Sequence, residues 1–343
     1  MRATVMRDSK LIVDTVPDPE PGPGEVLVKT LACGICGSDL HALTHADKLV
    51  EAAREANVPF TMDPARDVVL GHEFCAEVVD FGPETQRAMK PGTRVVSMPL
   101  VFGARGVHGV GYSNEYPGGY GELMALTEGF LLPVPNGLPT EHAALTEPMA
   151  VGVHAVGKAR LEPGDAPLVV GCGPVGLAVI GALRLRGAQP IVAADFSPAR
   201  RALAEKMGAH VVVDPATGSA MEALTQAAGA RPAVVFECVG VPGILNQLMR
   251  EAPQAARIVV VGVCMEDDRI RPMLGINKEL SLQFVIAYQP NEFADTLTAL
   301  AEGRILAEPV ITGRVGVEGV ADAFGVLATP DAHAKILVEP WRR

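Results

Sequence analysis

The sequence predicts an α/β protein with two domains, and three observations support this fold class. With 343 residues, the chain is longer than one hydrophobic core usually accommodates. The residues before 102 form short β-branched stretches separated by turns, whereas strand-like and helical stretches alternate from about residue 152. Such alternation is typical of a parallel sheet with crossover helices. We therefore expect a mostly β domain and a doubly wound parallel-sheet domain.

The first domain is expected to contain short strands between turns that are rich in Pro and Gly. These strands are Leu11–Val16, Glu25–Leu31, Asp67–Leu70, Phe74–Val79 and Arg94–Ser97. The apolar residues of Asp47–Ala56 fall on one face, which predicts a helix there. Residues 102–121 hold three of the four tyrosines and many glycines, and we interpret them as a loop lobe.

The second domain is expected to alternate strands and helices. Its strands are Leu168–Val170, Ile191–Ala194, Val211–Val213, Val234–Phe236, Ile258–Val261 and Leu282–Ile286. A helix is expected over Val175–Arg186, closed by Gly187. Beyond Pro290 we expect a helix at Phe293–Gly303 and a final apolar stretch at Ile336–Val338.

Charge and composition exclude several classes of function. The net charge of −11, from 29 basic and 40 acidic residues, disfavours nucleic-acid and anionic-membrane partners and favours a small-molecule substrate. The N-terminus lacks the apolar stretch of a signal peptide. The longest uncharged stretch, 166–183, contains two prolines and is a poor membrane span. Six cysteines without a secretory signal predict a cytoplasmic protein with free or metal-bound thiols.

A glycine motif predicts a dinucleotide site. It follows a predicted strand, opens a predicted helix, and consists of Gly171, Cys172, Gly173, Pro174, Val175 and Gly176. Glycines in this setting allow a tight turn and a close approach of backbone N–H groups to a pyrophosphate. A glycine-rich turn without a ligand is the alternative interpretation.

Asp195 supports the dinucleotide interpretation, because it ends the next strand 19 residues after Gly176. An acidic residue at about this spacing binds the ribose 2′-hydroxyl, and its charge would repel a 2′-phosphate. NAD is therefore favoured over NADP. Arg200 and Arg201 follow one turn into the next predicted helix, where either could reach the cofactor or face water. This pair keeps NADP open as the weaker alternative.

The stretch Cys33–His41 contains two thiols, a hydroxyl, a carboxylate and an imidazole within nine residues. No second Cys-x-x-Cys pair is present to complete a four-thiolate site. A catalytic zinc requires only three protein ligands with one open position. The candidates are Cys36, His72 and Glu147.

Four motifs occur in the order seen in the zinc-dependent medium-chain dehydrogenases of the alcohol dehydrogenase superfamily, which the chain resembles over nearly its whole length. They are Cys36–His41, Gly71–Glu73, Glu147–Pro148 and Gly171–Gly176. The resemblance implies a GroES-like catalytic domain at 1–151 and 289–343, and a Rossmann NAD-binding domain at 152–288. A glutamate as third ligand is similar to the sorbitol and polyol dehydrogenase branch, and somewhat to threonine dehydrogenases.

The resemblance also implies roles for individual residues. Cys36 as thiolate, neutral His72 and Glu147 would hold a catalytic zinc, while Glu73 would lie behind the metal or serve a structural role. Asp39 would accept a hydrogen bond from His72, cap a helix, or do both. Cys33 then becomes a packing residue.

Ser38 and His41 are three residues apart, a separation that can place both side chains on one face of a turn. They could pass the alcohol proton to solvent, and the ordinary pKa of histidine suits this relay. The alternatives are a local turn hydroxyl for Ser38 and an exposed histidine for His41.

On the cofactor side, the resemblance places Val261, Gly262 and Val263 beside the nicotinamide, with Val239 and Gly240 as weaker candidates. Many relatives carry four cysteines in the lobe that corresponds to 102–121, and this chain has none there. We therefore expect one catalytic zinc and no structural zinc. The segment 44–66 is longer than the resemblance leads us to expect.

These observations predict a zinc-dependent alcohol dehydrogenase that transfers a hydride between an alcohol and NAD. The alcohol could be a secondary alcohol, a polyol or a primary alcohol. The alternatives are an NADPH-dependent aldehyde or ketone reductase and a non-catalytic NAD-binding module. The resemblance implies a homodimer or homotetramer.

Overall fold

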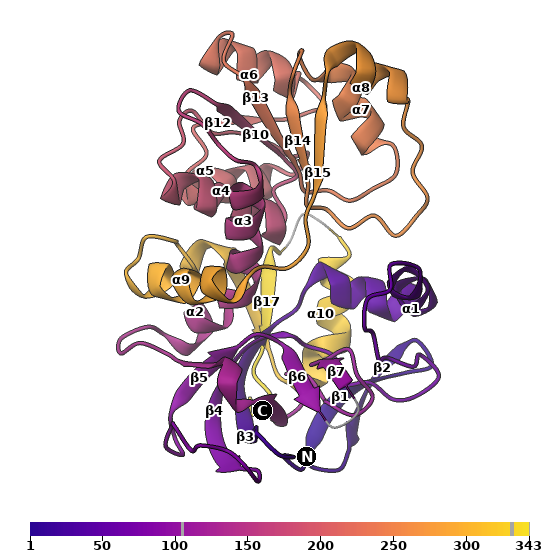
Figure 1. Ribbon diagram of the computed structural model, residues 1–343, viewed down its shortest axis with the longest axis vertical. Helices are drawn as coiled ribbons and strands as arrows, with labels where there is room; N and C mark the ends of the chain where they lie inside the picture. Colours follow the sequence, from indigo (N-terminus) through magenta and orange to yellow (C-terminus); the bar gives the residue numbers. More distant parts are fainter. Residues whose placement is uncertain (104–105, 330–332, 343) are drawn as a thin grey trace. The chain divides into compact units, whose positions relative to one another are not determined.

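The computed structural model describes residues 1–103, 106–329 and 333–342. The described chain divides into two compact units, which Figure 1 colours along the sequence. Unit 1 comprises Met1–Glu147, Ile311–Thr329 and Lys335–Arg343, and unit 2 comprises Pro148–Val310 and Pro330–Ala334.

The unit boundaries differ from the predicted domain boundaries at 151/152 and 288/289, most clearly beyond residue 288. Helix α9 (Pro290–Ala301) belongs to unit 2 rather than to the catalytic domain. Its Glu292 hydrogen-bonds His154 of α3 (Thr146–Lys158) at 2.7 Å, and its Phe293 ring stacks on Tyr288. The hydrogen bond to His154 joins residues 138 positions apart, which local sequence patterns do not reveal.

Unit 1 is built around a seven-stranded sheet with the order β16-β17-β3-β4-β5-β9, in which β8 also pairs with β3. All pairings are antiparallel except β16 with β17. The strands are β3 (Glu25–Gly34), β4 (Glu73–Phe81), β5 (Arg94–Ser97), β8 (Leu123–Thr127), β9 (Leu131–Pro133), β16 (Ile311–Val315) and β17 (Lys335–Val338). Two hairpins accompany the sheet, β1 (Arg2–Arg7) with β2 (Lys10–Thr15) and β6 (Leu100–Gly103) with β7 (Gly106–Gly109).

Two expectations for unit 1 need correction. Residues 67–70 form no strand, because only Val68 makes an isolated bridge, to Met6, while Leu70 O accepts a hydrogen bond from Tyr120 N. Residues 102–121 are not loop alone, since β6 and β7 pair there.

Helix α1 (Gly37–Glu55) begins ten residues before the predicted helix start at Asp47. Asp39 explains the early start, because its side chain accepts the N–H of Cys36 at 2.9 Å and so closes a capping box. A kink at His45, with φ −140° and ψ 34°, separates this first part from the predicted part.

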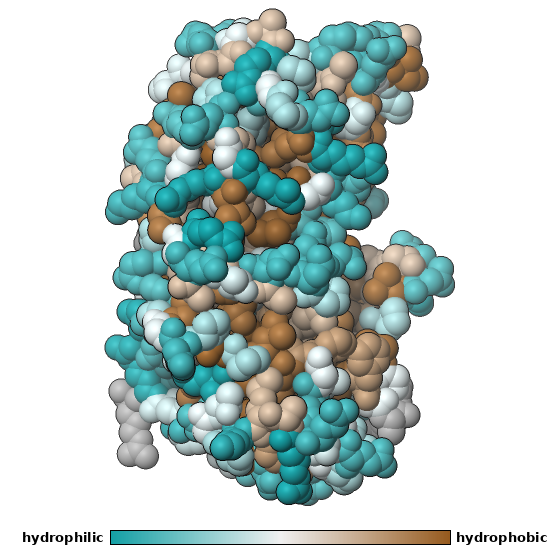
Figure 2. All heavy atoms as spheres, turned by 60° about the vertical axis from the view of Figure 1, so that its left-hand side comes forward, coloured by the Kyte–Doolittle hydropathy of each residue, from teal (hydrophilic) through white to brown (hydrophobic). Residues whose placement is uncertain are grey.

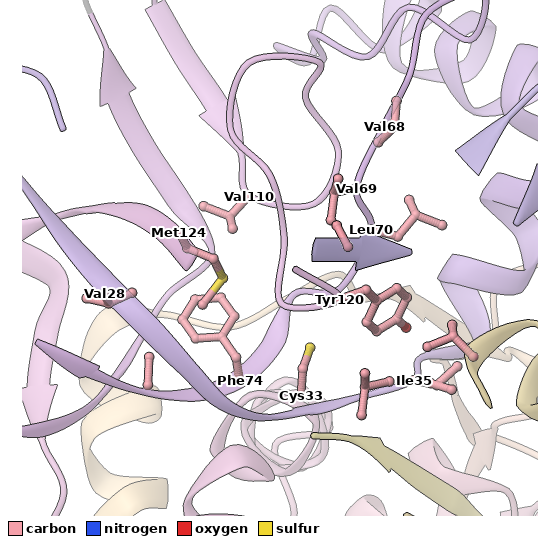
Figure 3. Packing of buried hydrophobic residues seen from close by; sticks show 14 of the residues in the cluster. Val28, Cys33, Ile35, Val68, Val69, Leu70, Phe74, Val110, Tyr120 and Met124 are labelled. Atoms are coloured by element: carbon pink, nitrogen blue, oxygen red, sulfur yellow. The ribbon is translucent and has the colours of Figure 1, made fainter. Parts of the chain in front are cut away.

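The core of unit 1 contains Cys33, whose side chain is fully buried. In Figure 3 its sulfur points into the cluster between Phe74 of β4 and Tyr120. The prediction that Cys33 is a packing residue is confirmed.

Unit 2 contains a six-stranded parallel sheet with the order β12-β11-β10-β13-β14-β15. Its strands are β10 (Ala166–Val170), β11 (Val192–Ala194), β12 (Val211–Val213), β13 (Ala233–Glu237), β14 (Arg257–Val260) and β15 (Ser281–Phe284). The strand order reverses beside β10, and ligands of such sheets bind outside the carboxyl ends of the strands at this point. The predicted parallel sheet is confirmed.

Helices accompany this sheet (Figure 1). They are α4 (Pro174–Leu185), α5 (Pro198–Met207), α6 (Ala220–Ala228), α7 (Ile244–Glu251) and α8 (Pro272–Lys278). In Figure 1, α7 and α8 lie beside β14 and β15. The shorter elements of the chain are α2 (Thr140–Ala144), α10 (Val320–Leu327), η1 (Glu128–Phe130), η2 (Glu308–Val310) and η3 (Val317–Gly319).

Hydrophilic side chains cover much of the face shown in Figure 2, with hydrophobic residues in smaller areas between them. Within the described residues, no helix has both the length and the apolar composition needed to cross a bilayer.

Candidate metal centre and cofactor site

Cys36, His72 and Glu73 form a group whose ligand atoms lie within 4.8 Å of one another. The antiparallel pairing of β3 with β4 brings them together. Gly34 at the end of β3 is the partner of Glu73 at the start of β4, so Cys36 and His72 lie just beyond the paired ends. Among the residues that the structure describes, this is the only such group of three or more metal-binding side chains.

The donor set fits a catalytic zinc, which accepts sulfur, nitrogen and oxygen ligands. His72 Nδ1 is buried and has no hydrogen-bond partner, which is unusual for a buried polar atom in a folded protein. Cys36 is half-buried, whereas His72 and Glu73 are buried.

Glu73 is fully buried and is paired with Lys335 of β17. Lys335 Nζ lies 2.7 Å and 2.6 Å from the two carboxylate oxygens, and it also donates to Ile35 O at 2.9 Å. Burial would lower the pKa of Lys335, but the Glu73 carboxylate outweighs it and raises that pKa. A Cβ atom at Gly34 would lie 2.0 Å from Glu73 Oε2, so a side chain at position 34 would displace this carboxylate.

Glu147 lies in the first turn of α3 and is not a member of the 4.8 Å group. Its negative charge nevertheless contributes to the raised pKa of Lys335. Glu147 therefore lies close enough to this buried pair to act on it electrostatically. Its assignment as a zinc ligand stays a prediction.

Asp39 organises the surroundings of His72. Its fully buried carboxylate accepts hydrogen bonds from Cys36 N at 2.9 Å, Tyr120 Oη at 2.6 Å and Tyr112 Oη at 3.1 Å. Burial would raise the pKa of Asp39, but the attraction of His72 and the hydrogen bonds from Tyr120 and Cys36 lower it. The carboxylate is therefore suited to stay ionised.

Asp39 Oδ1 lies 3.3 Å from His72 Nδ1, an ion-pair distance without the alignment of a hydrogen bond. Burial would lower the pKa of His72, whereas the Asp39 carboxylate raises it well above its usual value. Asp39 thus combines the two roles considered from the sequence, since it caps α1 and faces the imidazole.

The two relay candidates lie in the first turns of α1. Ser38 Oγ accepts a hydrogen bond from Tyr112 Oη at 2.8 Å. His41 is partly buried, and both this burial and the nearby His45, 6.5 Å away between ring centroids, lower the pKa of His41. Their relay stays a prediction.

In unit 2, the predicted phosphate loop has the required backbone. Gly171 has φ +93°, and a Cβ atom at Gly176 would lie 1.9 Å from Gly171 O, so glycine is required at both positions. Gly173 is the N-cap of α4, and Pro174 and Val175 open its first turn. The N–H groups of this turn are available for an anion.

Asp195 lies at the end of β11 beside this loop. Its carboxylate accepts the N–H of Cys172 and the N–H of Ser197, each at 2.8 Å. The side chain is thus held against the glycine loop at the place where a ribose would bind.

The structure separates the roles of Arg200 and Arg201. Arg201 Nη1 donates to the carbonyl oxygens of Asp195 and Phe196 at 2.7 Å and pairs with Asp214 at 3.2 Å. Arg200 Nε is buried without a partner, and Arg200 Nη1 lies 3.9 Å from the Cβ position of Gly173. Of the two candidates from the sequence, Arg200 is therefore the one whose guanidinium lies next to Gly173 of the phosphate loop without these pairings.

Val239, Val261, Gly262 and Val263 follow the carboxyl ends of β13 and β14. Val261 N and Gly262 N both donate to Glu237 O at 2.9 Å. These hydrogen bonds hold the segment after β14 next to the end of β13. The predicted cofactor residues of unit 2 therefore gather where the strands of the sheet have their carboxyl ends.

Sequence reasoning missed Tyr112, Lys335 and Glu237. Lys335 and Glu73 are 262 positions apart, and Tyr112 and Ser38 are 74 apart, so no local motif links them. The concentration of tyrosines in residues 102–121 was the one available signal for Tyr112.

Comparisons with known proteins agree with this architecture. The zinc-binding dehydrogenase family matches residues 174–302, and the alcohol dehydrogenase GroES-like domain family matches residues 22–136. (R,R)-butanediol dehydrogenase of Bacillus subtilis (strain 168) is 33% identical over 352 residues, covering 99% of this chain and 100% of that protein. Sorbitol dehydrogenase of the same strain is 28% identical over 361 residues, covering 100% and 98%.

Solved structures show the same fold. The crystal structure of 2R,3R-butanediol dehydrogenase from Bacillus subtilis matches with a TM-score of 0.84 and 31% identity, over 99% of each chain. A zinc-binding dehydrogenase from Sinorhizobium meliloti 1021, bound to NADP, matches with a TM-score of 0.84 and 29% identity, also over 99% of each chain. The predicted GroES-like and Rossmann fold is thus confirmed, and the chain belongs to the zinc-dependent medium-chain alcohol dehydrogenases.

Proposed function

We propose that this dehydrogenase oxidises secondary alcohol groups of vicinal diols or polyols to ketones, with NAD as the hydride acceptor. The observation that carries the proposal is the group of Cys36, His72 and Glu73, backed by the ionised Asp39. The butanediol and sorbitol dehydrogenases that match the chain over its length support the diol and polyol class.

Zinc would be held by Cys36, His72 and a carboxylate. When bound, it supplies a Lewis acid that lowers the pKa of an alcohol hydroxyl. We propose Glu147 as the third ligand, because Lys335 Nζ already lies within 2.7 Å of both oxygens of Glu73. Glu73 would then stay paired with Lys335 and lie close to the ligands without binding the zinc itself. We expect one zinc per chain.

The chain's own residues would carry the alcohol proton away. The Tyr112 hydroxyl donates a hydrogen bond to Ser38 Oγ and so fixes the orientation of the Ser38 hydroxyl. The proton of the Ser38 hydroxyl then remains free for donation to another group. His41 can take the proton onward because its lowered pKa keeps the imidazole neutral near pH 7.

The glycine loop, Asp195 and Arg200 would bind the cofactor, which supplies the hydride acceptor when bound. Asp195 favours NAD, since its carboxylate would repel a 2′-phosphate. Arg200 favours the second candidate, an NADPH-dependent carbonyl reductase, because its guanidinium borders the loop with an unpartnered Nε. The S. meliloti protein was crystallised with NADP. Comparison of kcat/KM for NAD and NADP in wild-type protein decides between the two.

We propose a homodimer as the working assembly, with a tetramer as the alternative. Among the strands that the structure describes, β15 pairs only with β14, so its outer edge presents unpaired backbone groups. Phe284, the last residue of β15, is 63% exposed, and Ile286, two residues beyond the strand, is 86% exposed. A second copy could cover this edge by antiparallel pairing about a two-fold axis. The six free cysteines support a location in the reducing cytoplasm.

The test of the function is NAD reduction in the presence of butane-2,3-diol stereoisomers, sorbitol and ethanol, with and without phenanthroline. We expect activity on the diols or on sorbitol that the chelator removes and added zinc restores. His72→Ala should abolish it. Activity that survives complete removal of zinc, or activity on none of these alcohols, would contradict the proposal.

A further inference from the structure

Glu237, the last residue of β13, is a buried carboxylate that no step above uses. Its Oε1 accepts the N–H of Val239 at 2.6 Å and the N–H of Gly240 at 2.8 Å. Its backbone oxygen accepts the N–H groups of Val261 and Gly262, each at 2.9 Å. One residue therefore binds four N–H groups from two separate chain segments.

These two segments pack backbone against backbone. Gly240 has φ +71°, and a Cβ atom on Gly262 would lie 2.4 Å from Gly240 N and 2.9 Å from Glu237 Oε2. Neither position has room for a side chain without a shift of its neighbours. The second carboxylate oxygen of Glu237 thus lies directly over Gly262.

Within the described residues, no Lys or Arg side chain pairs with Glu237. The backbone N–H groups of the turn are its hydrogen-bond donors instead. Hydrogen bonds of this kind to a charged group are stronger than those between neutral groups. Removing the carboxylate would leave the N–H groups of Val239 and Gly240 without their acceptor.

The surroundings connect Glu237 to the cofactor site. Cys238 N donates to Val170 O at 2.8 Å, and a Cβ atom on Gly171 would lie 2.8 Å from a methyl group of Val239. The segment that Glu237 holds therefore adjoins the phosphate loop. Val239 and Val263 are 42% and 52% exposed, so two apolar side chains flank this edge of the sheet.

We propose that Glu237 is a positioning residue for the nicotinamide half of the cofactor. Its carboxylate fixes Val239 and Gly240, its carbonyl fixes Val261 and Gly262, and together they present this edge to the nicotinamide ring. The proposal rests on the proposed function, since it assumes that a nicotinamide dinucleotide binds to unit 2.

The test compares NADH with ADP-ribose, which lacks the nicotinamide, as ligands in calorimetric titrations of zinc-loaded and zinc-free protein. In Glu237→Ala, we expect the Kd for NADH to rise about ten-fold, as expected for loss of hydrogen bonds to a charged acceptor. The Kd for ADP-ribose should change less than about two-fold. Glu237→Gln keeps one acceptor oxygen and should restore most of the NADH affinity.

Asp165→Asn is the matched control, because Asp165 is also a buried carboxylate of unit 2. It accepts the N–H of Glu162 at 2.6 Å and pairs with Arg257, beside the start of β10 and therefore at the opposite edge of the sheet. The affinities of Asp165→Asn for both ligands should equal those of wild type. In steady-state assays, Glu237→Ala should raise KM for NAD more than it lowers kcat, whereas Glu237→Gln should stay close to wild type in both.

Equal losses for NADH and ADP-ribose, or no loss for either, would overturn the role of Glu237 and leave the proposed function intact. Wild-type protein that binds neither ligand would instead refute the proposed function. Should Glu237→Ala fail to fold, Glu237→Asp is judged by the same comparison, since its shorter side chain cannot reach both N–H groups.

Discussion

Tyr112 lies among the side chains of the candidate metal centre. Its hydroxyl lies 2.8 Å from Ser38 Oγ and 3.1 Å from Asp39 Oδ1, and its ring centroid lies 5.2 Å from that of His72. A hydroxyl has one proton, so it donates to one of the two oxygens at a time. Tyr112 therefore connects the relay to the carboxylate that faces the imidazole.

Tyr112→Phe should lower kcat about five-fold near neutral pH, because one hydrogen bond contributes about 1 kcal/mol. The measurement is steady-state alcohol oxidation with saturating NAD. Tyr116→Phe is the control, since Tyr116 donates to Glu25 at 2.8 Å and should affect only thermal stability. Equal kcat values for Tyr112→Phe and wild type would contradict a role in the relay.

His41 gives a prediction for pH dependence. A neutral imidazole accepts a proton, so the relay gains activity as pH rises through the pKa of His41, which lies below the usual 6.5. His45→Gln removes one cause of this lowering and should move the acidic limb of the kcat profile toward higher pH. His210→Gln, in unit 2, should leave the profile unchanged. If the kcat profile of His45→Gln is identical to that of wild type, protonation of His41 does not determine the acidic limb of the profile.

The choice between Glu147 and Glu73 as zinc ligand is a question of zinc affinity. Loss of a residue that orients the metal ligands typically weakens metal affinity by about 10–100-fold, and loss of a ligand should weaken it more. We therefore expect Glu147→Gln to weaken zinc binding more than Glu73→Gln, as measured by competition with a chelator. The reverse order would identify Glu73 as the ligand. Melting temperatures of both variants show whether folding itself is affected.

At the scale of elements, the exposed end of β15 leads to a prediction about assembly. Ile286→Lys should shift the protein from dimer toward monomer in sedimentation velocity experiments, because a charge would be buried where two copies meet. Val13→Lys, at another exposed apolar position, on β2 of unit 1, is the control. A dimer of unchanged stability in Ile286→Lys would place the interface elsewhere.

Elements with strong local patterns were predictable from the sequence. The expected strands at β5 and β12 agree with the structure in both bounds, and the helix after the glycine motif agrees within one residue at each end. Residues 67–70 have a strand-like composition but no continuous partner strand. The strand predicted there from residue propensities was therefore wrong. Lys335 could not be predicted as the partner of Glu73, because their contact depends on β17 pairing with β3.

At the scale of the whole molecule, the six thiols give a further prediction. Burial raises the pKa of Cys75 and of Cys172 to about 12, so neither forms a reactive thiolate near pH 8. Cys33 is fully buried, and this burial raises the pKa of its thiol. Cys238 is only half-buried, but desolvation still raises the pKa of its thiol well above the usual value. Only Cys36 and Cys264 should react quickly with a disulfide reagent in native protein.

Zinc should protect Cys36, so the zinc-loaded protein should show one rapidly reacting thiol fewer than the zinc-free protein. Mass spectrometry of the labelled peptides checks this. Rapid labelling of Cys75 in folded protein would contradict the burial described above. In denaturant all six thiols should react.

The pairing of Glu73 with Lys335 has a consequence for biosynthesis. During translation, the N-terminal strands leave the ribosome long before residue 335. Glu73 therefore cannot pair with Lys335 until synthesis is almost complete. A buried carboxylate without its partner costs about 3–5 kcal/mol. The nascent chain therefore cannot complete the metal centre early, and a ribosome that stops short of β17 releases a chain that lacks this pair.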